Sequence, residues 1–262
     1  LDLLYPKAIG SPPPMIGAPD SPAQRFPQEA HHDWEESTEV VLSDSGYVQA
    51  VESAKLMRLC RRHGLCVQMI KRPGDFVGRG VTVARVRGLP RERQRLLRQL
   101  SDVFIMGIER TQQQDVAFVF DQLVEIAIRA LSSAINDSFT AIRCIDRLSD
   151  ALSAVAQTPF PSPYRHDADG VLRVVTQPVN FRVLVSQVLY PIAESASGRT
   201  GVILRLFRAV DEIAEECTEQ HQRAVLGDFL NYLESLSTNA PSAFERGTEI
   251  DAHRLRARRA IA

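Results

Sequence analysis

Residues 108–148, IERTQQQDVAFVFDQLVEIAIRALSSAINDSFTAIRCIDRL, decide the fold because they combine apolar residues at helical spacing with charged residues between them. At about 100° per residue, the polar side chains of the first predicted helix fall within one arc of about 120°. Apolar side chains occupy the rest of the helix surface, and Phe118 is the one apolar residue inside the polar arc. The stretch therefore predicts helices with wide apolar faces and a single polar stripe. The stripe consists of Asp115, Asp121, Gln122, Glu125 and Arg129.

Length and composition bound the class of protein. The chain has 262 residues, 44% hydrophobic and 24% charged, which is enough to bury a sizeable core. A net charge of -1 argues against a globally basic nucleic-acid binder, so we expect no nucleic-acid partner. No segment reaches the roughly 18 uninterrupted apolar residues that span a bilayer, and no secretion signal opens the chain. Because the chain opens on Leu1, we expect further residues to precede it. Four cysteines in apolar contexts predict buried free thiols and a reducing compartment: Cys60, Cys66, Cys144 and Cys217.

The chain divides by composition into three parts. Residues 1–37 are rich in proline, which removes amide donors and disfavours helix, so we expect an extended linker. Residues 38–88 carry short β-like runs separated by turn formers, interrupted by a helix over 53–63 that Gly64 can end in the left-handed conformation. Residues 89–262 are helical in period, except for a hairpin near 164–175 with a turn at Asp169-Gly170.

The predicted fold class is therefore α+β, mainly α. We expect a small β-rich, half-barrel-like module followed by an all-α helical bundle. Either Asn136 or Asp137 should cap one of the helices. The expected helices of the bundle cover residues 91–107, 112–132, 137–157, 180–195, 200–217, 219–236 and 242–259.

Three passages resemble a known family: LDLLYP at 1–6, SGYVQAVE with RPGDFVGRG and VARV between 45 and 86, and ERT…QD…QLVEIAIRALS…IND between 109 and 137. The chain is similar to the C-terminal soluble part of the bacterial predicted membrane proteins called domain of unknown function 2254. In that family transmembrane helices precede this region. The resemblance implies the bacterial inner membrane, with this portion on the cytoplasmic side, and it supplies no mechanism. Ser133, Ala134 and Ser138 stand where the family commonly has Pro, Gly and Pro, which loosens the loop between the helices.

The polar stripe is the candidate site, and its role is open. One interpretation is an ion-paired groove between helices, since buried charges persist when they are paired. The other is a polar pocket for a small anion or metabolite. The candidate pocket residues are Glu109, Arg110, Asp115, Glu125, Arg129, Asn136 and Asp137.

Catalysis is a further alternative. An enzyme would use Glu125 with Asp115 or Asp137 as acid–base groups and Arg129 to bind an anionic substrate. The sequence contains no nucleophile elbow, metalloprotease helix or dinucleotide fingerprint, so we favour a non-enzymatic role, assign no catalytic residue and expect no cofactor or metal.

Other motifs are weaker. Cys60, His63 and Cys66 have ligand-like spacing but lack a nearby fourth ligand, which argues against a zinc site. The basic tail HRLRARRAIA is either a solvated end or a segment that lies against anionic headgroups. We therefore predict a cytoplasmic regulatory, sensing or assembly domain of an integral bacterial membrane protein. The alternatives are an enzyme or small-ligand-binding domain and an oligomerisation scaffold, with a homo-oligomer as an expected state of the last.

Overall fold

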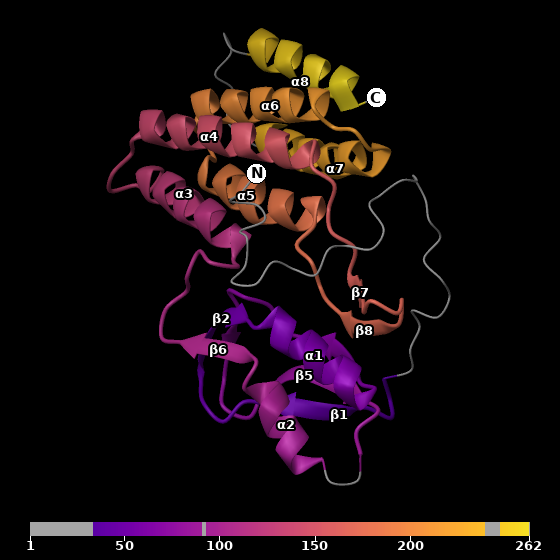
Figure 1. Cartoon of the computed structure of the whole chain (residues 1–262). Coiled ribbons are helices and arrows are strands. Elements are labelled where there is room, and N and C mark those ends of the chain that lie inside the picture. The colour runs from indigo at the N-terminus through magenta and orange to yellow at the C-terminus, as the bar shows by residue number, and fades with distance from the viewer. Residues whose placement is uncertain (1–33, 91–92, 239–246, 262) are drawn as a thin grey trace. The chain divides into compact units, whose positions relative to one another are not determined.

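The computed structural model describes residues 34–90, 93–238 and 247–261. The chain forms two compact units, and strands occur in the first and helices in both (Figure 1). Unit 1 comprises Leu1–Phe118 and Pro161–Pro178, and unit 2 comprises Val119–Phe160 and Val179–Ala262. The α+β, mainly α class is confirmed. Residues 1–33 of the expected linker over 1–37 lie outside the described residues.

The described residues of unit 1 form two sheets and two complete helices. The five-stranded sheet has the order β1-β5-β3-β8-β7, and the three-stranded sheet has the order β4-β2-β6. These are separate sheets, so the described residues do not show a closed half-barrel. The elements are β1 (Thr38–Val41), β2 (Gly46–Val51), α1 (Ser53–His63), β3 (Cys66–Met69), β4 (Phe76–Val77), β5 (Thr82–Arg87), α2 (Gln94–Ser101), β6 (Phe104–Gly107), β7 (Tyr164–His166) and β8 (Leu172–Val175).

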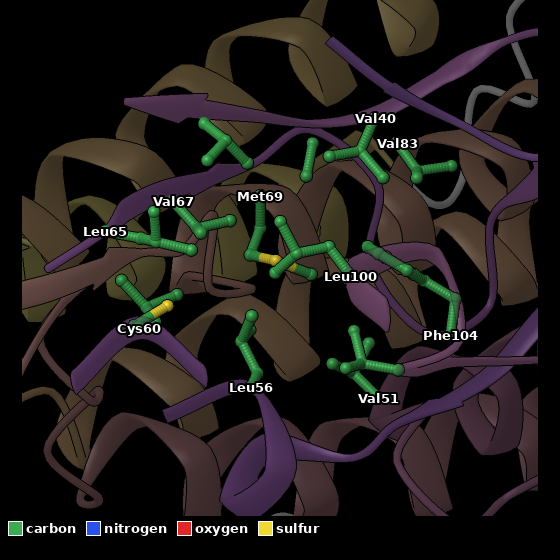
Figure 2. Packing of buried hydrophobic residues seen from close by; sticks show 14 of the residues in the cluster. Val40, Val51, Leu56, Cys60, Leu65, Val67, Met69, Val83, Leu100 and Phe104 are labelled. Carbon is green, nitrogen blue, oxygen red and sulfur yellow. The ribbon is translucent and has the colours of Figure 1, made fainter. Parts of the chain in front are cut away.

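The core of unit 1 collects apolar side chains from every second strand position and from one face of each helix (Figure 2). Val67 and Met69 of β3 are buried beside Leu56 and Cys60 of α1. Gly64 ends α1 with a φ of 67°, and its amide donates to the carbonyl of Cys60, as the sequence predicts. Alternation in the strands and the helical period of α1 thus build one apolar cluster.

The expected helix over 91–107 is wrong in its second half. Helix α2 ends at Ser101, and the chain then forms strand β6, which pairs antiparallel with β2. Leu100 of α2 and Phe104 of β6 are both buried in the unit 1 core, and each such side chain contributes about 1.5–3 kcal/mol by leaving water. Pairing with β2 therefore overrides the local helical period.

The hairpin near 164–175 is confirmed, and it completes the five-stranded sheet. Strand β8 pairs antiparallel with β7 and parallel with β3, where Val67 lies opposite Val174. Gly170 has a φ of 76°, which suits the turn. Unit 1 thus extends beyond the expected 38–88 module, since it also holds residues 89–118 and this hairpin.

Unit 2 is a layered helical bundle. Helix α4 packs on α6, α6 packs on α7 and α8, and α5 packs on α7 (Figure 1). Large side chains such as Phe181, Phe207 and Phe229 are fully buried there. Helix α3 begins in the last residues of unit 1 and continues in unit 2. The helices are α3 (Val116–Ala130), α4 (Ser138–Ala156), α5 (Phe181–Ser195), α6 (Thr200–Glu215), α7 (Gln220–Thr238) and α8 (Gly247–Ile261).

Candidate functional site

Two of the candidate residues, Arg110 and Asp115, meet in unit 1. The Asp115 side chain is only 4% exposed, and its Oδ2 accepts from Arg110 Nε at 2.8 Å and lies 2.6 Å from Arg110 Nη2. Its Oδ1 accepts from the backbone amide of Phe118 at 3.2 Å. The Arg110 guanidinium also lies 5.1 Å from the centre of the Phe118 ring. The carboxylate is therefore buried with its charge compensated by an arginine five residues earlier.

The Asp115 carboxylate lies against the bare backbone of Gly74. A Cβ at Gly74 would be 2.2 Å from Asp115 Oδ2, and Gly74 has a φ of 96°. The Gly74 amide donates to the carbonyl of Val48 at 2.8 Å, and the Val48 amide donates to the carbonyl of Asp75 at 2.9 Å. The RPGD turn, strand β2 and the segment after β6 thus meet at one point, and only glycine fits there.

Two glutamines fix the same segment to β2. The Gln114 amide group accepts from the Val51 amide at 3.0 Å and donates to the Val51 carbonyl at 3.3 Å, as a neighbouring strand would. Gln49 Nε2 donates to the carbonyl of Glu109 at 2.9 Å, and the Glu109 side chain itself is exposed. A Cβ at Gly107 would come within 2.1 Å of the Gln49 amide nitrogen. The polar motif residues of unit 1 therefore hold its chain segments together.

The polar stripe of α3 continues into unit 2 with a different environment. Phe120, Val124 and Ala127 form the buried face of the helix, which leaves Glu125 and Arg129 exposed. No ion pair joins these two side chains in the part of the chain that the structure describes. Their i to i+4 spacing thus places them on one helix face, but it does not make them a buried pair.

Asn136 and Asp137 shape the turn between α3 and α4. Asn136 has a φ of 50°, and its Oδ1 accepts from Arg199 Nε at 3.4 Å. Asp137 caps α4, as expected, by accepting from the amide of Thr140 at 3.1 Å and from its hydroxyl at 2.6 Å. The hydroxyl bond, followed by the amide bond, holds the pKa of Asp137 below its ordinary value.

Arg199 is a contributor to this turn that the sequence did not indicate. Its guanidinium donates to the carbonyl of Leu131 through Nη2 and to the carbonyl of Ser195 at 3.0 Å through Nη1. The side chain ties the end of α3 to the end of α5.

The seven candidate residues thus divide between the two units. Glu109, Arg110 and Asp115 belong to unit 1, whereas the other four belong to unit 2. The structure joins Arg110 to Asp115 directly. The convergence of all seven on one ligand stays a prediction. The four in unit 2 are Glu125, Arg129, Asn136 and Asp137.

Unit 2 also contains a polar groove between α4 and α6 that the sequence did not reveal, with a volume of about 440 Å³. Arg205 lies at its base with its side chain 13% exposed, bound to Asp146, to Ser149 Oγ at 3.0 Å and to Glu212 Oε2 at 2.9 Å. Within the described chain, its buried Nη1 has no hydrogen-bond partner. The only feature of the sequence that pointed to this groove is the helical spacing of acidic residues in α4 and in α6. The groove is lined by Asp146, Ser149, Asp150, Ser153, Ala154, Gln157, Arg205, Glu212, Glu215 and Glu216.

A second buried ion pair stabilises the hairpin of unit 1. Asp167 has a side chain 1% exposed, and it accepts from Arg173 Nε at 2.7 Å and from the amides of Asp169 and Val171 at 3.0 Å each. The Arg173 bond is the main cause of its lowered pKa. This carboxylate organises a turn and has no open side for a ligand.

The described residues provide no metal site. No group of three or more His, Cys, Asp or Glu side chains among them could hold a metal ion. Cys60 is fully buried, and burial raises the pKa of its thiol to about 12, so it is neither exposed nor ionised. Likewise, no helix in the described ranges is long and apolar enough to cross a membrane.

Taken together, these features define a mainly helical α+β protein. Arg110, Asp115 and Asp137 hold chain segments together, whereas Glu109, Glu125 and Arg129 are exposed. The family model described as "Predicted membrane protein (DUF2254)" matches residues 11–212, and the chain belongs to this family. It is 28% identical over 234 residues to uncharacterized proteins of Mycobacterium bovis and Mycobacterium tuberculosis, with 86% of this chain covered. The chain spans 42% of the length of those relatives. No solved structure matches it.

Proposed function

We propose that this chain is a cytoplasmic, non-catalytic part through which an integral bacterial membrane protein is regulated, senses a signal or assembles. The observation that carries the proposal is the cluster of Arg110, Asp115 and Gly74. The family resemblance singles out its charged residues, and the carboxylate of Asp115 is buried and paired with the partly exposed Arg110 inside unit 1. Membership of a family of predicted membrane proteins supports the attachment to a membrane.

The proposed location is testable in the full-length protein. Asp44 is exposed, so Asp44→Cys in a full-length background with every natural cysteine replaced by serine or alanine, including the four of this chain, gives one reactive thiol. A membrane-impermeant maleimide should label this thiol in inverted inner-membrane vesicles and not in intact spheroplasts. Labelling in intact spheroplasts would place the chain on the other side of the membrane and would refute the proposal. Asp169→Cys, also exposed, is a matched second position.

The non-catalytic role is tested by the groups that an enzyme would need. If Glu125 or Asp137 acted as an acid or base, Glu125→Gln or Asp137→Asn would abolish the function of the full-length protein while leaving its folding cooperative. We expect the Glu125→Gln variant to restore growth to a strain that lacks the gene, because this side chain is exposed and forms no ion pair with any described residue. Failure of complementation by a folded Glu125→Gln protein would favour the enzyme.

A ligand-binding role is the second candidate, and the groove between α4 and α6 is the observation that favours it. Carboxylates outnumber the single guanidinium among its lining residues, so it suits a cationic ligand better than the anion expected from the sequence. Spermidine should raise the melting temperature of the wild type. It should not raise the melting temperature of a double variant that carries Glu215→Gln and Glu216→Gln. An unchanged melting temperature of the wild type would remove this candidate for polyamines.

An oligomerisation scaffold remains the third candidate. Light scattering after size exclusion measures the mass of the particle directly. A monomer at every concentration would exclude the scaffold, and a stable dimer would support it.

A further inference from the structure

Helix α8, Gly247–Ile261, is held to the bundle by one face. Ala257 is fully buried, and the Ile261 Cγ2 lies 3.6 Å from the position that a Cβ would take at Gly227 of α7. Arg258 donates from Nε to Glu234 Oε1 at 3.0 Å and from Nη2 to Glu234 Oε2 at 2.6 Å. Among the described elements, the helix contacts only α6 and α7 extensively, so none of the other described helices covers its opposite face (Figure 1).

The opposite face carries two arginines and a leucine. Ala252, Leu255, Arg256 and Arg259 follow the spacing i, i+3, i+4, i+7, and at about 100° per residue they fall within an arc of about 100°. All four are exposed, and Leu255 is 53% exposed. No hydrogen bond or ion pair within the described part of the chain engages Arg256 or Arg259. Their charges are therefore available, in contrast to that of Arg258.

We propose that this outer face of α8 binds the headgroups of anionic phospholipids at a membrane surface. Arg256 and Arg259 supply charge complementary to lipid phosphates, and Leu255 between them enters the boundary with the acyl chains. A nucleic-acid duplex would use the arginines but would leave Leu255 in water. The combination of one apolar and two cationic side chains fits a lipid surface best.

The inference rests on the outer face of α8 and on the membrane character of the family, and it does not depend on the regulatory role or on the groove. It adds a peripheral lipid contact in a segment beyond residues 11–212, where the family model matches. Two arginines and one leucine give weak, salt-sensitive binding on their own. Low ionic strength and a high lipid concentration are therefore needed to detect it in the isolated chain.

The experiment is sedimentation of the 262-residue chain with vesicles of half phosphatidylglycerol and half phosphatidylcholine. The wild type should sediment with these vesicles and not with vesicles of phosphatidylcholine alone. Arg256→Gln with Arg259→Gln should lower the partition coefficient about 30-fold, because each cation near the surface contributes about a fivefold effect. Leu255→Ser should lower it about fivefold.

The matched control is Arg95→Gln with Arg98→Gln on α2. These arginines are also exposed and three residues apart on a helix, so the control removes the same charge elsewhere. It should sediment like the wild type, and circular dichroism should show unchanged helix content in every variant. Equal binding by the α8 double variant, equal loss in the α2 control, or no sedimentation of the wild type would overturn the proposal. If the wild type bound duplex DNA but not vesicles, and the α8 double variant lost the DNA binding, the face would be assigned to nucleic acid instead.

Discussion

Gly74→Ala is the substitution that tests the structural role of the charged motif residues most directly. A residue other than glycine at a φ of 96° costs about 1–2 kcal/mol in backbone strain. The new Cβ would also lie 2.2 Å from Asp115 Oδ2, so the carboxylate must move away from Arg110. Losing a charge-assisted hydrogen bond costs about 1.5–3 kcal/mol. We therefore expect unit 1 to lose about 2.5–5 kcal/mol of unfolding free energy.

Gly80→Ala is the matched control in the same unit. Gly80 has a φ of 75°, but a Cβ there would meet no atom within 4 Å. Its substitution should cost only the strain, about 1–2 kcal/mol. A second control uses Asp115→Ala as the background. Without the carboxylate, Gly74→Ala should cost no more than Gly80→Ala, which isolates the contact with Asp115.

Urea unfolding followed by tryptophan fluorescence measures these differences. Trp34 is the only tryptophan of the chain, and it belongs to unit 1, so its emission reports on that unit. Circular dichroism followed in parallel is dominated by the helices of unit 2. The reasoning is refuted if Gly74→Ala and Gly80→Ala have equal effects, or if the cost of Gly74→Ala is the same with and without Asp115.

Three further predictions concern the other buried groups. Because Arg173 lowers the pKa of Asp167 in the folded chain, the stability from this pair is present at neutral pH. It is lost as the pH falls below about 4 through the lowered pKa, and Asp167→Asn should flatten that part of the curve of unfolding free energy against pH. Arg199→Gln removes hydrogen bonds to the carbonyls of Leu131 and Ser195, so amide hydrogen exchange over 131–137 should be about tenfold faster; unchanged exchange would contradict the role of this side chain. Because burial raises the pKa of Cys60 to about 12, Ellman's reagent at pH 8 should react with this thiol only after urea is added, whereas rapid reaction in the native chain would contradict its burial.

Local signals predicted most of the secondary structure. The helix over 53–63 and its glycine cap, the Asp137 cap of α4 and the Asp169-Gly170 turn depend on neighbours within a few residues, so the sequence contains them. Strand β6 was missed for the opposite reason. Leu96, Leu100 and Val103 continue a helical period up to the strand, and only pairing with β2, far away in the sequence, makes Phe104–Gly107 extended.

The candidate site was predictable in its residue types but not in its pairings. The periodicity of α3 groups Glu125 and Arg129 on one face, yet it does not say whether another helix covers that face. Arg205 binds Asp146 across two helices, and Arg199 binds the carbonyl of Leu131 in the same way. Such contacts join residues about 60 positions apart, and no spacing rule within one helix reaches that far.

The parallel pairing of β3 with β8 imposes an order on biosynthesis. The partner that completes this side of β3 leaves the ribosome only after α3 and α4 have been made. Until then, β3 exposes unpaired amides and carbonyls that another nascent chain could bind. A fragment truncated at Phe118 would keep this unpaired, aggregation-prone edge of β3 permanently. An isolated unit 1 therefore needs residues 161–178 to be joined to residues 1–118.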